Sequence, residues 1–138
     1  YLNNILAKIE ANNAGCLEAI MLNSQGFVAE CTGDNIFLIK DGAIVTPDTS
    51  AGMLHGITRR FVIEEVAPAC GYTVEERTVA REELFEADEI FLTGTAAEVI
   101  GVCSIDGSPI GAGVVGPITT QLVEQFHSMV AGELAERA

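Results

Sequence analysis

The 138-residue sequence has no tryptophan and little positive charge, with 7 lysines and arginines against 20 aspartates and glutamates. A formal net charge of −13 at pH 7 argues against nucleic acid as a partner, because nucleic-acid-binding proteins hold phosphates mainly through lysine and arginine. No apolar run approaches the ~20 residues that a bilayer-spanning helix requires. We therefore expect neither nucleic acid nor a membrane as a partner.

The sequence also lacks a Cys-x-x-Cys motif. Its two histidines lie far apart and its four cysteines are scattered, so no metal site is predicted. Thiols without a pairing pattern are typical of a reducing compartment, which favours a cytoplasmic protein. We expect mostly buried, reduced thiols at Cys16, Cys31, Cys70 and Cys103.

Hydrophobic residues make up 49% of the chain, which is too much for a disordered tail. A chain of this length has the size of one ordinary domain and can bury a substantial core. No internal repeat or change in composition marks a second domain. We therefore expect residues 1–138 to form a single domain.

Hydrophobic periodicity predicts helices separated by hairpins. Helices are expected from residue 2 to just before Gly15, and over residues 56–70, 80–87 and 117–135. Strands are expected over residues 18–22, 27–30, 35–40, 43–46, 73–79, 89–93 and 99–105. Pro68 should distort the last turn of the second helix. This order predicts an α/β domain with a mixed, largely antiparallel sheet and packed helices.

Two segments have residues suited to binding a charged ligand. Glu30 ends an apolar strand, where a carboxylate is costly unless it has a partner such as a protonated ring nitrogen. Gly56, Ile57 and Thr58 open a helix, and first-turn amides suit an anion such as a phosphate. Pyridoxal 5'-phosphate (PLP) needs both kinds of contact. By themselves, these residues also fit a solvent-facing glutamate and an ordinary helix start.

Three motifs, taken together, are more specific. They are Tyr1-Leu2-Asn3-Asn4-Ile5-Leu6-Ala7, the block from Glu30 to Phe37 with Leu54 to Arg59, and Phe91-Leu92-Thr93-Gly94-Thr95-Ala96-Ala97-Glu98. Their order and spacing resemble the class IV aminotransferases, and the first and third motifs look like the branched-chain amino acid members in particular. The resemblance runs from Tyr1 to about Glu124. It implies the fold of that family's large C-terminal domain and PLP as the cofactor.

The resemblance also implies roles for single residues around the cofactor. Glu30 matches the partner of the ring nitrogen, Leu54 the residue that packs on the ring face, and Tyr1 a tyrosine near the phenolic oxygen. For Leu54, simple core packing is equally compatible with the sequence. The residues that match phosphate contacts are Gly56, Ile57, Thr58 and Thr95.

The turn after the strand over residues 89–93 matches the part of the family that binds the substrate carboxylate. Amides at Thr95 and Ala96 would make this contact; the alternative is a turn that needs small residues for packing. Asn35 is expected to be structural, bridging neighbouring backbone groups. Arg59 is expected to form a structural ion pair.

The lysine that binds the cofactor covalently in the family lies a few residues before the match to Tyr1, so the resemblance places it upstream of this sequence. Lys8 and Lys40 do not match it, and the family's smaller N-terminal domain has no counterpart here. The sequence therefore predicts the cofactor-binding domain of a transaminase acting on branched-chain L-amino acids with 2-oxoglutarate, in a homo-oligomer. The domain by itself is expected to be inactive.

Two other interpretations remain open at this point. One is a D-amino acid aminotransferase or an aminodeoxychorismate lyase on the same scaffold. The other is a non-catalytic half-site, to which a separate chain carrying the N-terminal domain would restore activity. Every interpretation that includes catalysis takes an amino acid and a 2-oxo acid, or a related small molecule, as substrates.

Overall fold

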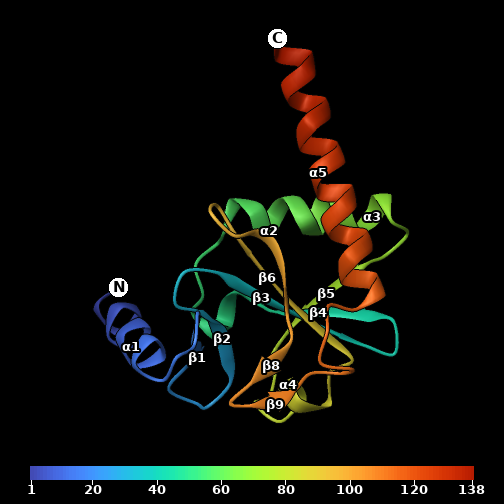
Figure 1. Ribbon diagram of the computed structural model, residues 1–138. Coiled ribbons are helices and arrows are strands. Elements are labelled where there is room, and N and C mark those ends of the chain that lie inside the picture. The colour runs from blue at the N-terminus through green and yellow to red at the C-terminus, as the bar shows by residue number, and fades with distance from the viewer.

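The structure is a computed structural model that describes residues 1–138. Its centre is a five-stranded sheet with the order β5-β4-β3-β6-β7 (Figure 1). The strands are β3 (Asn35–Lys40), β4 (Ala43–Pro47), β5 (Val74–Arg77), β6 (Glu89–Gly94) and β7 (Glu98–Val102). Neighbouring strands are antiparallel except β4 and β5, which are parallel. The predicted mixed, largely antiparallel α/β fold is confirmed.

Helices cover one face of this sheet. They are α2 (Ile57–Phe61), the π-helical segment η2 (Val62–Val66), α3 (Ala67–Ala69) and α5 (Pro117–Arg137), which runs across the sheet and projects beyond it (Figure 1). Strand alternation directs Phe37 and Phe91 to this face, where their rings stack with centroids 4.6 Å apart. Leu122 and Phe126 of α5 join the same cluster.

Smaller elements cover the opposite face. They are the β1–β2 hairpin (Ile20–Leu22 and Val28–Cys31), α4 (Glu83–Glu86) and the β8–β9 hairpin (Ser104–Ile105 and Ser108–Pro109). Ile36 and Leu38 point to this side and pack with Val28 and Leu84. The β2–β3 and β6–β7 connections both lie at one end of β3 and β6, since Asn35 pairs with Thr93 in the register.

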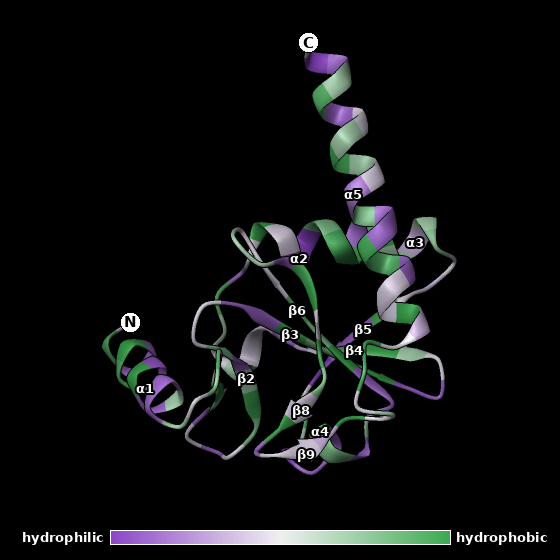
Figure 2. Ribbon diagram, viewed as in Figure 1, coloured by the Kyte–Doolittle hydropathy of each residue, from purple (hydrophilic) through white to green (hydrophobic).

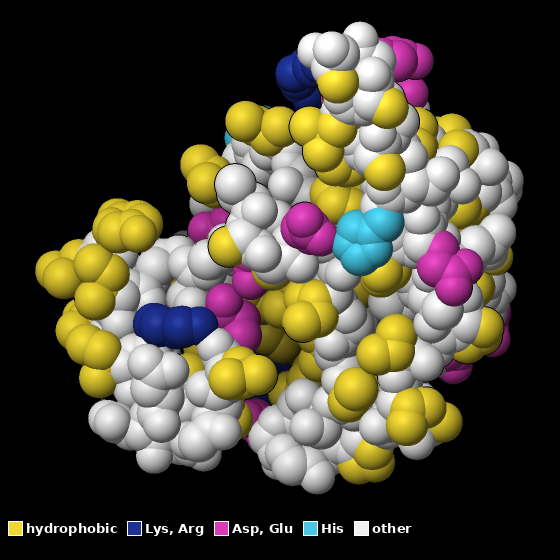
Figure 3. All heavy atoms as spheres, turned by 45° about the horizontal axis from the view of Figure 1, so that its top comes forward, with side chains coloured by type: hydrophobic (Ala, Val, Ile, Leu, Met, Phe, Trp, Pro, Cys, Tyr) yellow, Lys and Arg dark blue, Asp and Glu magenta, His cyan; other side chains and the backbone are white.

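The first helix, α1 (Leu2–Asn13), buries only Ala11. Its turns alternate between apolar and polar residues (Figure 2), and apolar side chains gather over it at the left of the space-filling view (Figure 3). The apolar residues of the predicted helix, Leu2, Ile5, Leu6 and Ile9, are all exposed. The periodicity therefore predicted the helix correctly, but its apolar face has no partner among these residues.

The helix predicted over residues 56–70 has a wider turn in its middle. The amide of Ala67 donates to the carbonyl of Val62, five residues back, which defines the π-helical segment η2. Pro68 follows directly; it has no amide hydrogen, and its ring would crowd the carbonyl four residues before it in a regular α-helix. The predicted distortion of the last turn is wrong in its place, because residues 67–69 are α-helical (α3) and the irregular turn is η2, which comes before them.

The single strand predicted over residues 99–105 is wrong. Strands β6 and β7 are antiparallel, and Val102 of β7 pairs with Ile90 of β6. Because β6 begins at Glu89, one residue before Ile90, the chain beyond Val102 has no strand beside it. Ser104 and Ile105 pair instead with Ser108 and Pro109. The remaining predicted elements are present, most of them with shifted ends; the strands predicted over residues 18–22 and 73–79, for example, are shorter.

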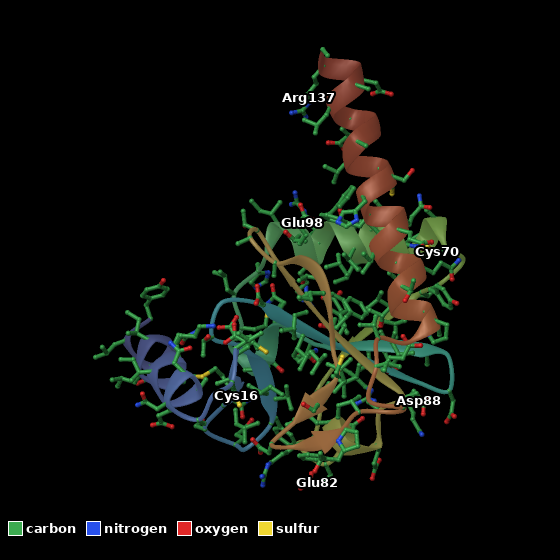
Figure 4. All side chains as sticks on the ribbon, viewed as in Figure 1. Cys16, Cys70, Glu82, Asp88, Glu98 and Arg137 are labelled. Carbon is green, nitrogen blue, oxygen red and sulfur yellow. The ribbon has the colours of Figure 1, made fainter.

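All four cysteines are free thiols, and Cys16 and Cys70 lie far apart in Figure 4. The expectation that they are mostly buried is wrong, because Cys16 and Cys103 are exposed and only Cys31 is fully buried. Burial raises the pKa of the Cys31 thiol far above its usual range, and the nearby carboxylates add to this effect. None of the helices has the length and apolar character needed to cross a bilayer.

Candidate functional site

Glu30 is tied directly to Leu54 of the second motif. Strand β2 presents its half-buried carboxylate, and Glu30 Oε2 accepts the Leu54 amide at 2.9 Å. The other carboxylate oxygen accepts no hydrogen bond from the rest of the chain. Glu30 is therefore not the unpaired, solvent-facing glutamate that the sequence by itself also allowed. The free oxygen is available to a hydrogen-bond donor of a ligand.

The start of α2 has unused amides. Gly56 precedes the helix in an extended conformation, with φ −65° and ψ 138°, and no side chain caps it. No acceptor within the chain takes the amides of Ile57 and Thr58. The start of α5 differs, because Glu89 accepts the amides of Ile118 and Thr119 there. Of these two helix starts, only that of α2 is open to an anion.

Asn35 connects these two features. Its Nδ2 donates to the Leu54 carbonyl at 2.9 Å, and a Cβ on Gly56 would lie 2.2 Å from its Oδ1. Gly56 is therefore required by this close approach, since its φ suits any residue. The prediction that Asn35 bridges neighbouring backbone groups is wrong, because its one hydrogen bond to the backbone reaches a carbonyl 19 residues away in the sequence.

The third motif lies beside the same end of β3. Gly94 approaches Asp34 so closely that a Cβ would lie 1.9 Å from Asp34 Oδ1. Thr95 and Ala96 follow in the exposed turn between β6 and β7. Helix α2 packs against β6, whereas Glu98, just after the turn, pairs with His127 of α5 at 2.8 Å. The turn thus borders Asp34, and the start of α2 borders the next residue, Asn35.

The remaining expected cofactor residues are exposed. Tyr1 is 96%, Leu54 74% and Ile57 79% exposed, so their side chains are free to contact a ligand or another segment. Tyr1 lines a groove of about 290 Å³ between α1 and the β2–β3 turn, with Thr32 on the facing side. The structure brings together Glu30, Leu54, the start of α2 and the Gly94 turn; it shows no contact between Tyr1 and Glu30.

Arg59, Lys8 and Lys40 have partners within the chain. Arg59 is buried, and its Nη2 donates to the Pro47 carbonyl at 2.9 Å and to Glu76 at 2.6 Å, so the predicted structural ion pair is confirmed. Lys8 contacts Glu18, and Lys40 pairs with Asp88 at 3.1 Å. Both lysines are therefore engaged with carboxylates of this chain.

A pair of carboxyl groups beside the site was not predicted. Burial opposes ionisation of Glu18, but hydrogen bonds from Thr32 and Ala19 outweigh it and hold the pKa of Glu18 below its usual range. Burial and the neighbouring Glu18 raise the pKa of Asp34. No sequence pattern indicates this pair, because the two residues come from segments 16 positions apart.

The fold and this site define a class of protein. The family described as amino-transferase class IV matches residues 1–105, and the chain belongs to this family. Two of its relatives within the family carry more specific names. A probable branched-chain-amino-acid aminotransferase of Aquifex aeolicus is 52% identical over 97% of this chain, and the branched-chain-amino-acid aminotransferase of Pseudomonas aeruginosa is 44% identical over all of it.

Solved structures agree with these relatives. The branched-chain amino acid aminotransferase of Thermobaculum terrenum, in its PLP form, has a TM-score of 0.90 and 43% identity over 96% of this chain. The enzyme of Thermoproteus uzoniensis with norvaline has a TM-score of 0.90 and 44% identity over 96%. The chain spans only 43–44% of the length of these four proteins.

Proposed function

We propose that this chain is the cofactor-binding domain of a PLP-dependent branched-chain amino acid aminotransferase. The observation that carries the proposal is the link through Leu54 between a half-buried carboxylate, Glu30, and a helix start with unused amides. When bound, PLP supplies a protonated pyridine ring that acts as an electron sink. The donor set fits such a group, because it offers an acceptor for a ring N–H and donors for a phosphate.

Glu30 holds the proton on the ring nitrogen. Its Oε2 is already occupied by the Leu54 amide, so Oε1 is the oxygen that accepts the ring N–H. A carboxylate paired with a protonated nitrogen forms a charge-assisted hydrogen bond, and this keeps the ring cationic. The Leu54 side chain, which is 74% exposed, provides an apolar surface against one face of the ring.

The amides of Ile57 and Thr58 bind the phosphate at the positive end of the helix dipole. Gly56 allows close approach of the backbone, and the hydroxyls of Thr58 and Thr95 provide further donors. This arrangement holds an anion mainly through amides and hydroxyls, which agrees with a chain of net charge −13.

The turn at Thr95 and Ala96 binds the substrate carboxylate through its amides. The amine that reacts with the cofactor comes from a lysine outside these 138 residues, since Lys8 and Lys40 are engaged elsewhere. Tyr1 would hold the phenolic oxygen of the cofactor, a role supported by its match to the family tyrosine. Substrates are branched-chain L-amino acids and 2-oxoglutarate, a choice supported by the names of the relatives and by the wording of the first and third motifs.

Residues 1–138 then form one domain of a larger, homo-oligomeric enzyme. The exposed apolar face of α1 supports this view, because it requires cover that these residues do not supply. Four free thiols, two of them exposed, fit the cytoplasm as the compartment.

The test uses the full-length protein. Purified protein is mixed with PLP, reduced with borohydride and weighed intact, and transamination is assayed with L-leucine, L-isoleucine, L-valine and D-alanine, each with 2-oxoglutarate. We expect one pyridoxyl adduct per subunit and turnover of the three L-amino acids only. No adduct, or turnover of D-alanine in place of the L-amino acids, would contradict the proposal.

The role of Glu30 has its own variant. Glu30→Gln retains the shape but not the negative charge that holds the ring proton. We expect the adduct to form as in the wild type while kcat falls on the order of 10²-fold, the usual cost of losing one electrostatic contact to the reacting group. Glu124→Gln, an exposed charge on α5 without a partner, is the matched control. Near-normal turnover of Glu30→Gln would contradict the role at the ring nitrogen.

A further inference from the structure

Asn35 is a buried side chain whose hydrogen bonds all go to one loop. It is 5% exposed, and its Nδ2 donates to the Leu54 carbonyl at 2.9 Å and lies 3.8 Å from Met53 Sδ. Its Oδ1 faces Gly56 so closely that a Cβ there would lie 2.2 Å away. Asn35 therefore contacts three of the four residues between Met53 and Gly56.

This loop joins the two halves of the proposed cofactor site. The Leu54 amide donates to Glu30 at 2.9 Å, and the Leu54 carbonyl accepts both Asn35 and the Gly56 amide, the latter also at 2.9 Å. The Leu54 side chain is 74% exposed, so the buried anchor of the loop is its neighbour Met53, which is 6% exposed. The polar contacts of Leu54 with Glu30 and Asn35 thus fix the carboxylate relative to the start of α2.

We propose that Asn35 is a positioning residue for the cofactor, setting the distance between the Glu30 carboxylate and the amides of Ile57 and Thr58. The inference rests on the proposed function, and Asn35 itself touches no part of the cofactor. The position needs an uncharged donor of this length. An aspartate would turn a carboxylate oxygen toward the Leu54 carbonyl, and an alanine would leave that carbonyl held only by Gly56.

The test compares Asn35→Asp with Thr46→Val in the full-length protein. Thr46 is also fully buried and donates to a backbone carbonyl, that of Ile36, at 2.7 Å, but its side chain makes no hydrogen bond to the loop. Both variants lose a buried hydrogen bond, so both should lose stability to urea. The readout is the dissociation constant of PLP, measured by absorbance titration of the apoprotein, with kcat and KM recorded separately.

We expect Asn35→Asp to raise the PLP dissociation constant about tenfold to hundredfold, as misplaced binding groups typically do, and Thr46→Val to change it less than about twofold. An unchanged constant in Asn35→Asp, or an equal rise in both variants, overturns the positioning role. A wild-type protein that binds no PLP overturns the proposed function instead, so the two failures are distinct.

A second approach perturbs the same contact without removing a buried polar group. Gly56→Ala places a methyl group where the Asn35 amide lies, so it should also weaken PLP binding. Asn35→Ala removes that amide and makes room for the methyl. The double variant should therefore bind PLP no more weakly than Asn35→Ala, because contacting residues are not additive. Losses that simply add would overturn the proposal.

Discussion

Glu89 is predicted to stabilise the protein by capping α5. It is 8% exposed, and its two carboxylate oxygens accept the amides of Ile118 at 3.1 Å and Thr119 at 2.7 Å. Glu89→Gln keeps the shape, but its NH₂ group then faces one of the two amides. A hydrogen bond to a charged group contributes about 1.5–3 kcal/mol, and a charge at a helix start about 0.3–1 kcal/mol. We therefore expect a loss of about 2–4 kcal/mol.

The assay is urea denaturation of the full-length protein, combined with hydrogen exchange of the peptide that covers residues 117–120. Glu124→Gln lies on the same helix without a partner and should change stability by less than about 0.5 kcal/mol. Gly116→Ala should mimic Glu89→Gln, because its Cβ would lie 2.1 Å from Glu89 Cδ. If Glu89→Gln were as stable as Glu124→Gln, with unchanged exchange, the capping role would be refuted.

Three further predictions follow from buried or paired groups. Arg59→Met should lower the free energy of unfolding in urea by about 1–3 kcal/mol, because it leaves the Pro47 carbonyl without a donor. Glu76→Gln changes the partner of Arg59, whose side chain is 43% exposed, and should cost under about 1 kcal/mol. Equal losses of stability in the two variants would contradict this prediction. Hydrogen bonding to Arg77 lowers the pKa of Glu83, so the native state binds fewer protons there than the unfolded state. Its stabilisation is present at neutral pH and is lost as pH falls from 4.5 through the lowered pKa. The difference in stability between Glu83→Gln and wild type should therefore shrink steadily as the solution is acidified. Burial raises the pKa of the Cys31 thiol, so iodoacetamide should label this residue only after unfolding, as peptide mass mapping would show.

The elements that the sequence predicted well are those with a strong local pattern. The hairpin from Asn35 through Asp41 and Gly42 was predicted within a residue, because alternation and turn chemistry both act over a few positions. The strand over residues 99–105 was mispredicted because its break depends on where β6 begins, which is a property of its partner. The π-helical segment depends on the packing of a whole helix around Pro68 and is invisible to a periodicity argument.

The candidate site was predictable as a set of residues but not as a geometry. Glu30 and the Gly56 segment could be identified, yet nothing in the sequence indicated that Leu54 joins them through its amide and carbonyl. The Glu89 cap and the Glu18–Asp34 pair were missed for the same reason, since each joins side chains to partners far away in the sequence. Contacts of this kind arise only once the sheet has brought its ends together.

The most direct test of the account is a crystal structure of the full-length protein with PLP. We predict the ring nitrogen about 2.7–2.9 Å from a Glu30 oxygen, as in other charge-assisted pairs, and phosphate oxygens on the amides of Ile57 and Thr58. The Leu54 amide should still donate to the other Glu30 oxygen. A ring nitrogen that contacts another group, or a phosphate bound away from the start of α2, would contradict the central claim.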